Sequence, residues 1–162
     1  MPPHTTDSLV SALSRILLDH RWKIVTAESC TGGAIAQALT RLPGSSQWFD
    51  CGFVTYSNSS KEKILGVNHT TLLEFGAVSE QTAHEMAIGA LKNSQAQLSI
   101  AVTGITGPTG ATRDKPVGTV WFAWTLTDNK TESRVCYFQG DRESVREQSV
   151  QFALQQLLEK II

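Results

Sequence analysis

Apolar positions recur three and four residues apart near both ends of the chain, and this spacing is typical of amphipathic helices. Near the N-terminus the residues concerned are Leu9, Val10, Leu13, Ile16 and Leu17. Near the C-terminus they are Val150, Ala153, Leu154, Leu157, Leu158 and Ile161. The pattern predicts one helix over residues 5–20 and a final helix capped by Asp141.

The stretch between these helices alternates short β-rich runs with helical segments. Strands are predicted over residues 22–27, 49–56, 98–102, 117–126 and 133–138. Helices are predicted over 34–41, around 61–65 and 70–75, and from Ser79 onward. Because the last two strands follow one another, the sheet should be mixed. We therefore expect an α/β fold, a three-layer α/β/α sandwich with a mixed, mostly parallel sheet of about five strands in a single domain over residues 1–162.

Composition narrows the possible partners. The 162 residues carry a net charge of −1, with 41% hydrophobic and 18% charged residues, so there is no basic excess for nucleic acid. Apolar runs are too short for a membrane span, and residues 1–7 lack the features of a signal peptide. Three widely spaced cysteines match neither a disulfide framework nor a metal site. We expect a cytoplasmic protein with no nucleic-acid or membrane partner.

A strand–turn–helix segment holds the first candidate site. After the strand over 22–27, Ser29 and Thr31 supply hydroxyls, and Gly32 and Gly33 let a ligand approach the backbone. Free amides at a helix N-terminus bind phosphate or a developing oxyanion. The alternative interpretation is an ordinary helix cap with two turn glycines.

Tyr56 and Lys61 follow the second predicted strand. A lysine acts as a base only if its pKa falls from about 10.4 toward 7 or 8, which requires burial or a neighbouring cation. A solvated surface lysine is the alternative. Further along, Thr103, Gly104 and Gly107 belong to a Gly- and Thr-rich loop typical of a phosphate or sugar cradle, or of a long structural turn.

Arg142 opens the last helix and is a candidate for bidentate phosphate binding. Pairing with Asp141 or Glu28 is the simpler interpretation. The four histidines are isolated and lack metal-ligand spacing. Hydrolytic chemistry here is therefore expected to use neither a metal nor histidine.

These segments, in this order, resemble the CinA C-terminal domain family over about residues 8–158. The matching segments are Ala27-Glu28-Ser29-Cys30-Thr31-Gly32-Gly33, Pro43-Gly44-Ser45-Ser46 with Trp48-Phe49, Gly52-Phe53-Val54-Thr55-Tyr56-Ser57-Asn58, Lys61, Leu65-Gly66-Val67, Gly76-Ala77-Val78-Ser79, Thr103-Gly104-Ile105, Gly107-Pro108, Lys115-Pro116-Val117-Gly118-Thr119-Val120 and Gly140-Asp141-Arg142.

The resemblance implies a stand-alone, cofactor-free amidohydrolase that converts nicotinamide mononucleotide to nicotinic acid mononucleotide and ammonia, a step of pyridine nucleotide recycling. It implicates Ser29, Ser46, Tyr56 and Lys61 in catalysis. We rank Ser46 slightly ahead of Ser29 as the nucleophile, with neutral Lys61 as its base and Tyr56 assisting. Backbone amides of one glycine-rich loop would stabilise the oxyanion, while the other loop and Arg142 hold the phosphate.

One alternative concerns the nucleophile. Cys30 lies at the same predicted helix N-terminus, which lowers a thiol pKa. Glu28 and Lys61 could complete a Cys–Glu–Lys set of the kind that other amidases use.

A second alternative concerns the function, because the chain departs from the family's usual pattern in four places. The family usually has alanine, aspartate and glycine where this chain carries Thr106, Thr109 and Ala111, and an acidic residue where it carries Ser59. An inactive or altered-substrate nucleotide-binding paralogue is therefore the competing function. The apolar final helix, Trp48, Phe49 and Phe75 suit either a homodimer interface or a core.

Overall fold

The computed structural model describes residues 4–162. Residues 1–3, on which part of the signal-peptide expectation rests, lie outside the described residues. The strands are β1 (Ile24–Glu28), β2 (Phe49–Val54), β3 (Leu98–Gly104), β4 (Thr119–Thr125) and β5 (Thr131–Tyr137). The helices are α1 (Thr6–His20), α2 (Ala34–Leu39), the 3-10 turn η1 (Ser45–Gln47), α3 (Asn58–Leu65), α4 (His69–Phe75), α5 (Glu80–Lys92) and α6 (Arg142–Ile161).

One mixed sheet runs through the middle of the molecule in the order β2-β1-β3-β4-β5. β1 pairs in parallel with both β2 and β3, whereas β3–β4 and β4–β5 are antiparallel. Four strands therefore point the same way and β4 alone is reversed, which confirms the predicted mixed, mostly parallel sheet. The antiparallel pairing of β4 with β5 follows from the short turn that links them.

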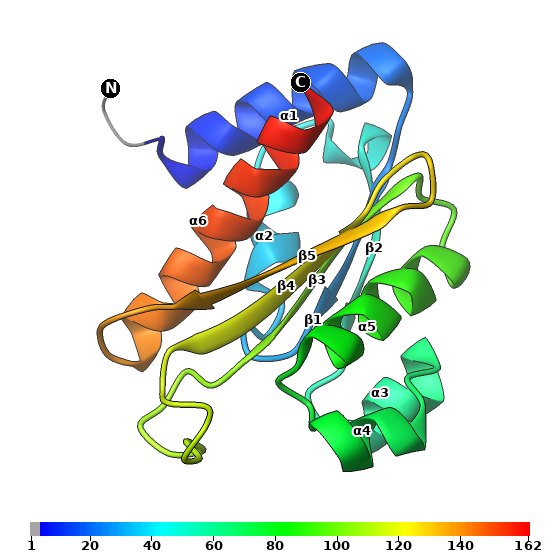
Figure 1. Cartoon of the computed structure of the whole chain (residues 1–162). Helices are drawn as coiled ribbons and strands as arrows, with labels where there is room; N and C mark the ends of the chain where they lie inside the picture. The colour runs from blue at the N-terminus through cyan, green and yellow to red at the C-terminus, as the bar shows by residue number, and fades with distance from the viewer. Residues whose placement is uncertain (1–3) are drawn as a thin grey trace.

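Helices cover both faces of this sheet, as Figure 1 shows. One face packs against α1, α2 and α6 through the larger apolar cluster, which includes Leu13, Ile100, Phe122 and Leu154. The other face packs against α3, α4 and α5 through a smaller cluster that includes Met86, Ala87 and Ala101. The three-layer α/β/α sandwich predicted from the sequence is confirmed.

The predicted helix starts carry side-chain caps where the sequence placed them. Ser79 Oγ accepts a hydrogen bond from the Thr82 amide at 3.2 Å and caps α5. Asp141 Oδ1 accepts from the Ser144 amide at 2.9 Å and caps α6. Asp141 therefore fixes where α6 begins, and with it the position of Arg142.

The connections that leave β1 and β2 diverge at their carboxyl ends. β1 leads into α2 on one face of the sheet, whereas β2 leads into α3 on the other (Figure 1). In open α/β sheets such a divergence leaves a crevice outside the carboxyl ends of the strands, where ligands commonly bind. Ser29 follows β1 directly and Tyr56 lies two residues beyond β2, so the fold brings both to this crevice.

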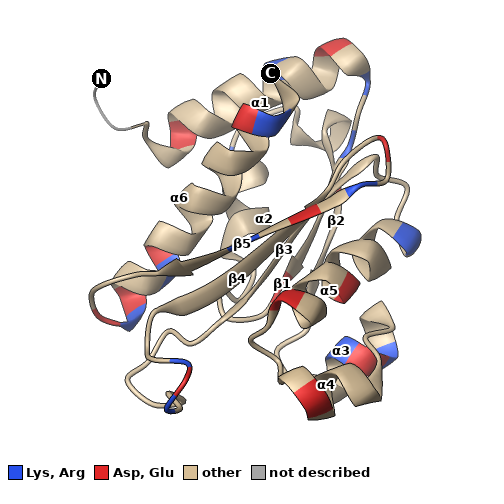
Figure 2. Cartoon of the chain, in the orientation of Figure 1, with Lys and Arg blue, Asp and Glu red and all other residues tan. Residues whose placement is uncertain are grey.

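Charged residues of both signs are interspersed along the helices and loops (Figure 2). Within residues 4–162, no helix is both long and apolar enough to cross a membrane. The aromatic residue Trp48 is 4% exposed and belongs to the core, as does the apolar face of α6, whereas Phe75 is 39% exposed.

Candidate active site

Ser29 lies at the carboxyl end of β1, in the centre of the parallel part of the sheet. Its amide donates to the Val102 carbonyl on β3 at 3.1 Å, so the backbone at this point is fixed to the neighbouring strand. The residue is 8% exposed. Ser29 is therefore a buried hydroxyl held on a rigid element, as a nucleophile requires.

Lys61 extends toward Ser29 from α3, which covers the face of the sheet opposite to α2. It lies on α3, which begins where Ser57 Oγ accepts from the Ser60 amide. The residue is only 1% exposed. Its Nζ lies 3.0 Å from Ser29 Oγ, 2.8 Å from the Thr55 carbonyl oxygen and 3.3 Å from the Tyr56 carbonyl oxygen.

Burial changes the acidity of this lysine. Removal from water disfavours the ammonium form and lowers the pKa of Lys61 from 10.5 to about 8. A charged ammonium has three N–H donors, which suit the three oxygens around Nζ. A neutral amine has two donors and one lone pair, which suit the two carbonyls and the Ser29 hydroxyl proton. The same geometry thus accommodates both protonation states, as a proton-transfer group requires.

A cavity of about 270 Å³ opens above this pair. Besides Ser29 and Lys61, its walls are formed by the β2–α3, α4–α5 and β3–β4 connections and the start of α6. The lining residues are Ser29, Cys30, Tyr56, Lys61, Ala77, Val78, Thr103, Gly104, Ile105, Thr106, Gly107, Thr109, Gly110 and Arg142. Segments far apart in sequence therefore meet at one site.

Two of these lining residues, Ala77 and Val78, lie outside the segments for which the sequence predicts a binding role. Four others belong to the Gly- and Thr-rich loop predicted as a cradle but are not singled out by the sequence: Ile105, Thr106, Thr109 and Gly110. Ala77 is held in place because its carbonyl accepts from Thr103 Oγ1 at 2.9 Å. The Gly76-Ala77-Val78-Ser79 segment is one of the motifs that carry the family resemblance, and this motif is the sequence signal for this wall of the cavity. The family usually has glycine where this chain carries Ala111, but the backbone here does not require the glycine conformation. Among the described non-glycine residues, only Arg21 and Asn129 have a positive φ.

Arg142 spans the mouth of the cavity. Its Nη1 donates to Thr106 Oγ1 and to the Gly107 carbonyl, both at 2.9 Å, and its Nη2 donates to Tyr56 Oη at 3.1 Å. Among the ion pairs of residues 4–162, none involves Arg142. The predicted pairing with Asp141 or Glu28 is absent there, and the guanidinium charge remains available for an anion.

Glu28 makes its hydrogen bonds to the other glycine-rich loop, which connects β1 to α2, and to the first turn of α2. Its buried carboxylate accepts from Thr31 Oγ1 at 2.5 Å and from the Ile35 and Ala36 amides at 2.8 and 3.0 Å. The Ala34 amide donates to the Thr31 carbonyl at 3.1 Å. The first amides of α2 are thus satisfied internally, and the expected anion site at this helix end is already occupied by a carboxylate.

The structure does not bring Thr31, Gly32 or Gly33 to the cavity. Thr31 is fully buried against Glu28, and its carbonyl accepts from Arg146 Nη2 at 3.1 Å. Gly32 and Gly33 both have positive φ values, 60° and 99°, so they serve the turn into α2. Their predicted role in substrate binding therefore stays a prediction without a contact to support it, whereas Thr103, Gly104 and Gly107 do line the cavity.

Cys30 lines the cavity, but the pKa of its thiol is too high for a thiolate at neutral pH. Burial, together with the carboxylate of Glu28, raises the pKa of the Cys30 thiol to about 12. This is opposite to the lowering expected at a helix N-terminus. Because Glu28 is engaged by α2, it is also not free to act with Cys30 and Lys61. The geometry gives the Cys–Glu–Lys alternative no support.

Ser46 lies at the opposite end of the sheet from Ser29. It belongs to η1, which leads into the start of β2, and the Trp48 carbonyl at that end accepts from the Ile24 amide. The exposed Ser46 lines a separate cavity with Leu18, Arg21, Lys23 and Gln47. At about 3.3 Å per residue, the length of β1 alone separates the two ends by ~13 Å. The structure therefore does not bring Ser46 together with Lys61.

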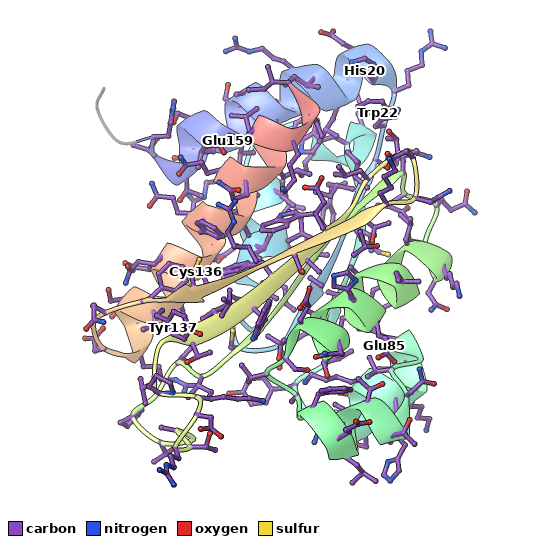
Figure 3. The ribbon with its side chains drawn as sticks, viewed as in Figure 1. His20, Trp22, Glu85, Cys136, Tyr137 and Glu159 are labelled. Atoms are coloured by element: carbon purple, nitrogen blue, oxygen red, sulfur yellow. The ribbon has the colours of Figure 1, made fainter. Side chains whose placement is uncertain are left out.

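Among residues 4–162, no group of three or more His, Cys, Asp or Glu side chains is arranged to hold a metal ion. His20 stacks on Trp22 at the end of α1, with ring centroids 4.1 Å apart (Figure 3). Cys136 lies on β5 near α6 (Figure 3). A larger cavity of about 480 Å³ between α1, α2 and α6 mixes arginine and glutamate side chains but has no lysine or serine among its lining residues.

Comparison with known proteins identifies relatives of this chain. The family model of the CinA C-terminal domain matches residues 6–161. The nicotinamide-nucleotide amidohydrolase PncC of Enterobacter agglomerans is 51% identical over 87% of this chain and 86% of its own length. The protein of the same name from Pseudomonas putida is 46% identical over 98% of both chains.

A solved structure agrees with the family match. The crystal structure of competence damage-inducible protein A from Klebsiella pneumoniae has a TM-score of 0.94 and 40% identity, with 98% of each chain covered. Sequence, family model and three-dimensional fold coincide over nearly the whole described chain. The chain belongs to the CinA C-terminal domain family.

Proposed function

We propose that this protein hydrolyses the carboxamide of nicotinamide mononucleotide, giving nicotinic acid mononucleotide and ammonia. The observation that carries the proposal is the buried Lys61 Nζ, 3.0 Å from Ser29 Oγ inside an open cavity. The amidohydrolase names of two relatives at 46–51% identity support the substrate.

The Ser29–Lys61 pair accounts for the chemistry. Neutral Lys61 accepts the Ser29 hydroxyl proton as Oγ attacks the amide carbon. The resulting ammonium then protonates the leaving nitrogen, which departs as ammonia and leaves an ester on Ser29. Lys61 next takes a proton from water, whose oxygen attacks the ester carbon, and returns that proton to Ser29 as the acid product leaves.

Tyr56 assists through its backbone as well as its ring. Its carbonyl accepts from Lys61 Nζ, and its hydroxyl accepts from Arg142. Tyr56 therefore positions the base and the cation at the cavity mouth, rather than relaying a proton to Ser29. Of the amides in the two loops, those of Ser29 and Ile105 are already donated to Val102 and Thr119. We assign oxyanion stabilisation to the Cys30 amide instead.

Arg142 is proposed to bind the substrate phosphate. It lines the cavity and makes no ion pair within residues 4–162, and a guanidinium binds phosphate bidentately. We also propose a cytoplasmic, homodimeric protein acting as one domain on a small nucleotide without a cofactor. Three free cysteines suit a reducing compartment.

Ammonia release from nicotinamide mononucleotide tests the proposal. The wild type is compared with Lys61→Met, which keeps the length of the buried side chain but removes the base. We expect a loss of about 10²–10⁴-fold in kcat. The matched control is Lys63→Met, a solvent-exposed lysine on the same helix, which should retain activity.

Two results would reject the proposal. An active, folded Lys61→Met enzyme excludes the lysine as base. No ammonia from a folded wild type, while a known amidohydrolase turns over in parallel, rejects the substrate and favours the nucleotide-binding paralogue.

A further inference from the structure

Thr106 makes a contact that the catalytic pair does not require. It lies in the β3–β4 connection and is 5% exposed. Its hydroxyl oxygen accepts from Arg142 Nη1 at 2.9 Å, across 36 residues of sequence. Because Thr is branched at Cβ, few side-chain rotamers are open to it. A buried, stiff acceptor thus fixes one of the two Nη1 donors of Arg142.

The hydrogen bonds of Arg142 leave one part of the guanidinium free. A guanidinium has five N–H donors. Both N–H donors of Nη1 are used, one by Thr106 Oγ1 and one by the Gly107 carbonyl. One of the two Nη2 donors is used by Tyr56 Oη. Among the described residues no partner takes the remaining two donors, which is the number that a bidentate phosphate contact uses.

Arg142 is also the one cation at the described cavity that is free for a ligand. The other lining cation, Lys61, is buried and engaged with Ser29, Thr55 and Tyr56. Lys115, in the same connection as Thr106, donates to the Phe75 carbonyl at 2.7 Å and does not line the cavity. Recognition of a dianion therefore depends on how Arg142 is oriented.

We infer that Thr106 is a positioning residue that orients Arg142 and so sets the preference for phosphorylated over unphosphorylated substrates. The inference rests on the proposed function. Thr106 acts through the side chain of Arg142, and its hydroxyl contacts neither Ser29 nor Lys61. Loss of that hydroxyl should therefore affect binding of the phosphate and not the chemical step.

The test measures kcat and KM for nicotinamide mononucleotide and for nicotinamide riboside, which lacks the phosphate. Thr106→Ala removes the acceptor, Thr106→Ser restores it, and Thr112→Ala is the matched control. Thr112 lies in the same connection, and its hydroxyl accepts from the Lys115 amide at 3.2 Å without touching Arg142.

Thr106→Ala should raise KM for the mononucleotide about 3- to 10-fold, with kcat changed less than about twofold. The effect is smaller than the full loss of a hydrogen bond to a charged group, because the Gly107 carbonyl and Tyr56 Oη still hold Arg142. Activity on the riboside should stay unchanged. Thr106→Ser and Thr112→Ala should match the wild type on both substrates. Equal losses on both substrates, a change in kcat alone, or an unaffected mononucleotide KM overturns the inference.

Binding separates this inference from the proposed function. If the wild type hydrolyses neither compound, the proposed function fails, and calorimetric Kd values for the same two compounds decide about Thr106. Weaker binding of the mononucleotide alone in Thr106→Ala, restored in Thr106→Ser, upholds the inference. No binding of the mononucleotide by the wild type, or equal Kd values in wild type and Thr106→Ala, overturns it.

Discussion

Two serines that resemble each other in sequence lie at opposite ends of the sheet. Both Ser29 and Ser46 stand near glycines in a turn beside β1 or β2. Ser29 is 8% exposed and 3.0 Å from a buried lysine. Ser46 is exposed, in the 3-10 turn at the amino end, and shares its cavity with Arg21 and Lys23.

The proposed mechanism therefore attributes the reactivity of Ser29 to its environment and not to its motif. A serine hydroxyl is a weak nucleophile until a base accepts its proton. Only the carboxyl end of β1 brings a hydroxyl against a lysine whose pKa burial lowers to about 8. The amino end offers no comparable buried lysine among the described lining residues.

Replacing each serine by alanine should give the largest contrast. Ser29→Ala removes the nucleophile and should lower kcat for ammonia release at least about 10³-fold, as removal of a serine nucleophile does elsewhere. Ser46→Ala removes an exposed hydroxyl and should change kcat less than about twofold. Both are measured with nicotinamide mononucleotide at saturating concentration.

Thermal unfolding of both variants serves as the control, because Ser29 is buried and Ser46 is not. If Ser46→Ala is the inactive variant while Ser29→Ala is active, the ranking from the sequence is right and the dyad proposed here is wrong. A trapped ester on Ser29, detected by mass spectrometry of the intact protein, would distinguish covalent catalysis from direct attack by water.

The layers of the fold were predictable because they depend on local patterns. Helical spacing and caps at Ser79 and Asp141 predicted where α5 and α6 begin, and consecutive strands predicted the antiparallel pair β4–β5. The strand ends shifted by one or two residues: β2 ends at Val54, so Tyr56 lies in the connection to α3. Such ends depend on long-range pairing, which periodicity does not report.

The site was only half predictable, because its residues meet through tertiary structure. Ser29, Lys61, Tyr56 and Arg142 were each named from the sequence, and the structure brings them to one cavity. The sequence could not show that the Glu28 carboxylate accepts hydrogen bonds from the first amides of α2. This contact depends on how the chain turns between β1 and α2, which brings the Ala36 amide back to the carboxylate eight residues before it. It also could not exclude Ser46, whose distance from Lys61 depends on strand direction.

The pH dependence of hydrolysis tests the buried base, with an effect of about tenfold. In the proposed mechanism neutral Lys61 is the active form, and burial lowers its pKa to about 8. The neutral fraction then rises from about one tenth at pH 7 to about nine tenths at pH 9. The value of kcat/KM should increase accordingly and level off above pH 8, once most of the lysine has lost its proton.

An exposed lysine would place that rise near pH 10.4. A profile still climbing steeply between pH 9 and 10 would therefore contradict a Lys61 pKa that burial has lowered to about 8. Folding is monitored by circular dichroism across the same range, so that unfolding is not mistaken for loss of the active form.

Replacement of Cys30 should have the smallest effect of the variants at this end of the sheet. The thiol lines the cavity, but its raised pKa of about 12 keeps it protonated at neutral pH. Cys30→Ala deletes one buried sulfur atom beside Ser29 and should lower kcat/KM by less than about threefold, with some loss of thermal stability. Ammonia release and the midpoint of thermal unfolding are measured together.

The same variant sharpens the comparison between the two serines. Because Ser29→Ala removes a neighbouring atom of similar size, a comparable loss of activity in both variants would mean that packing, not nucleophilicity, explains the Ser29 effect. A large loss in Ser29→Ala beside a small one in Cys30→Ala would attribute the chemistry to the hydroxyl that Lys61 contacts.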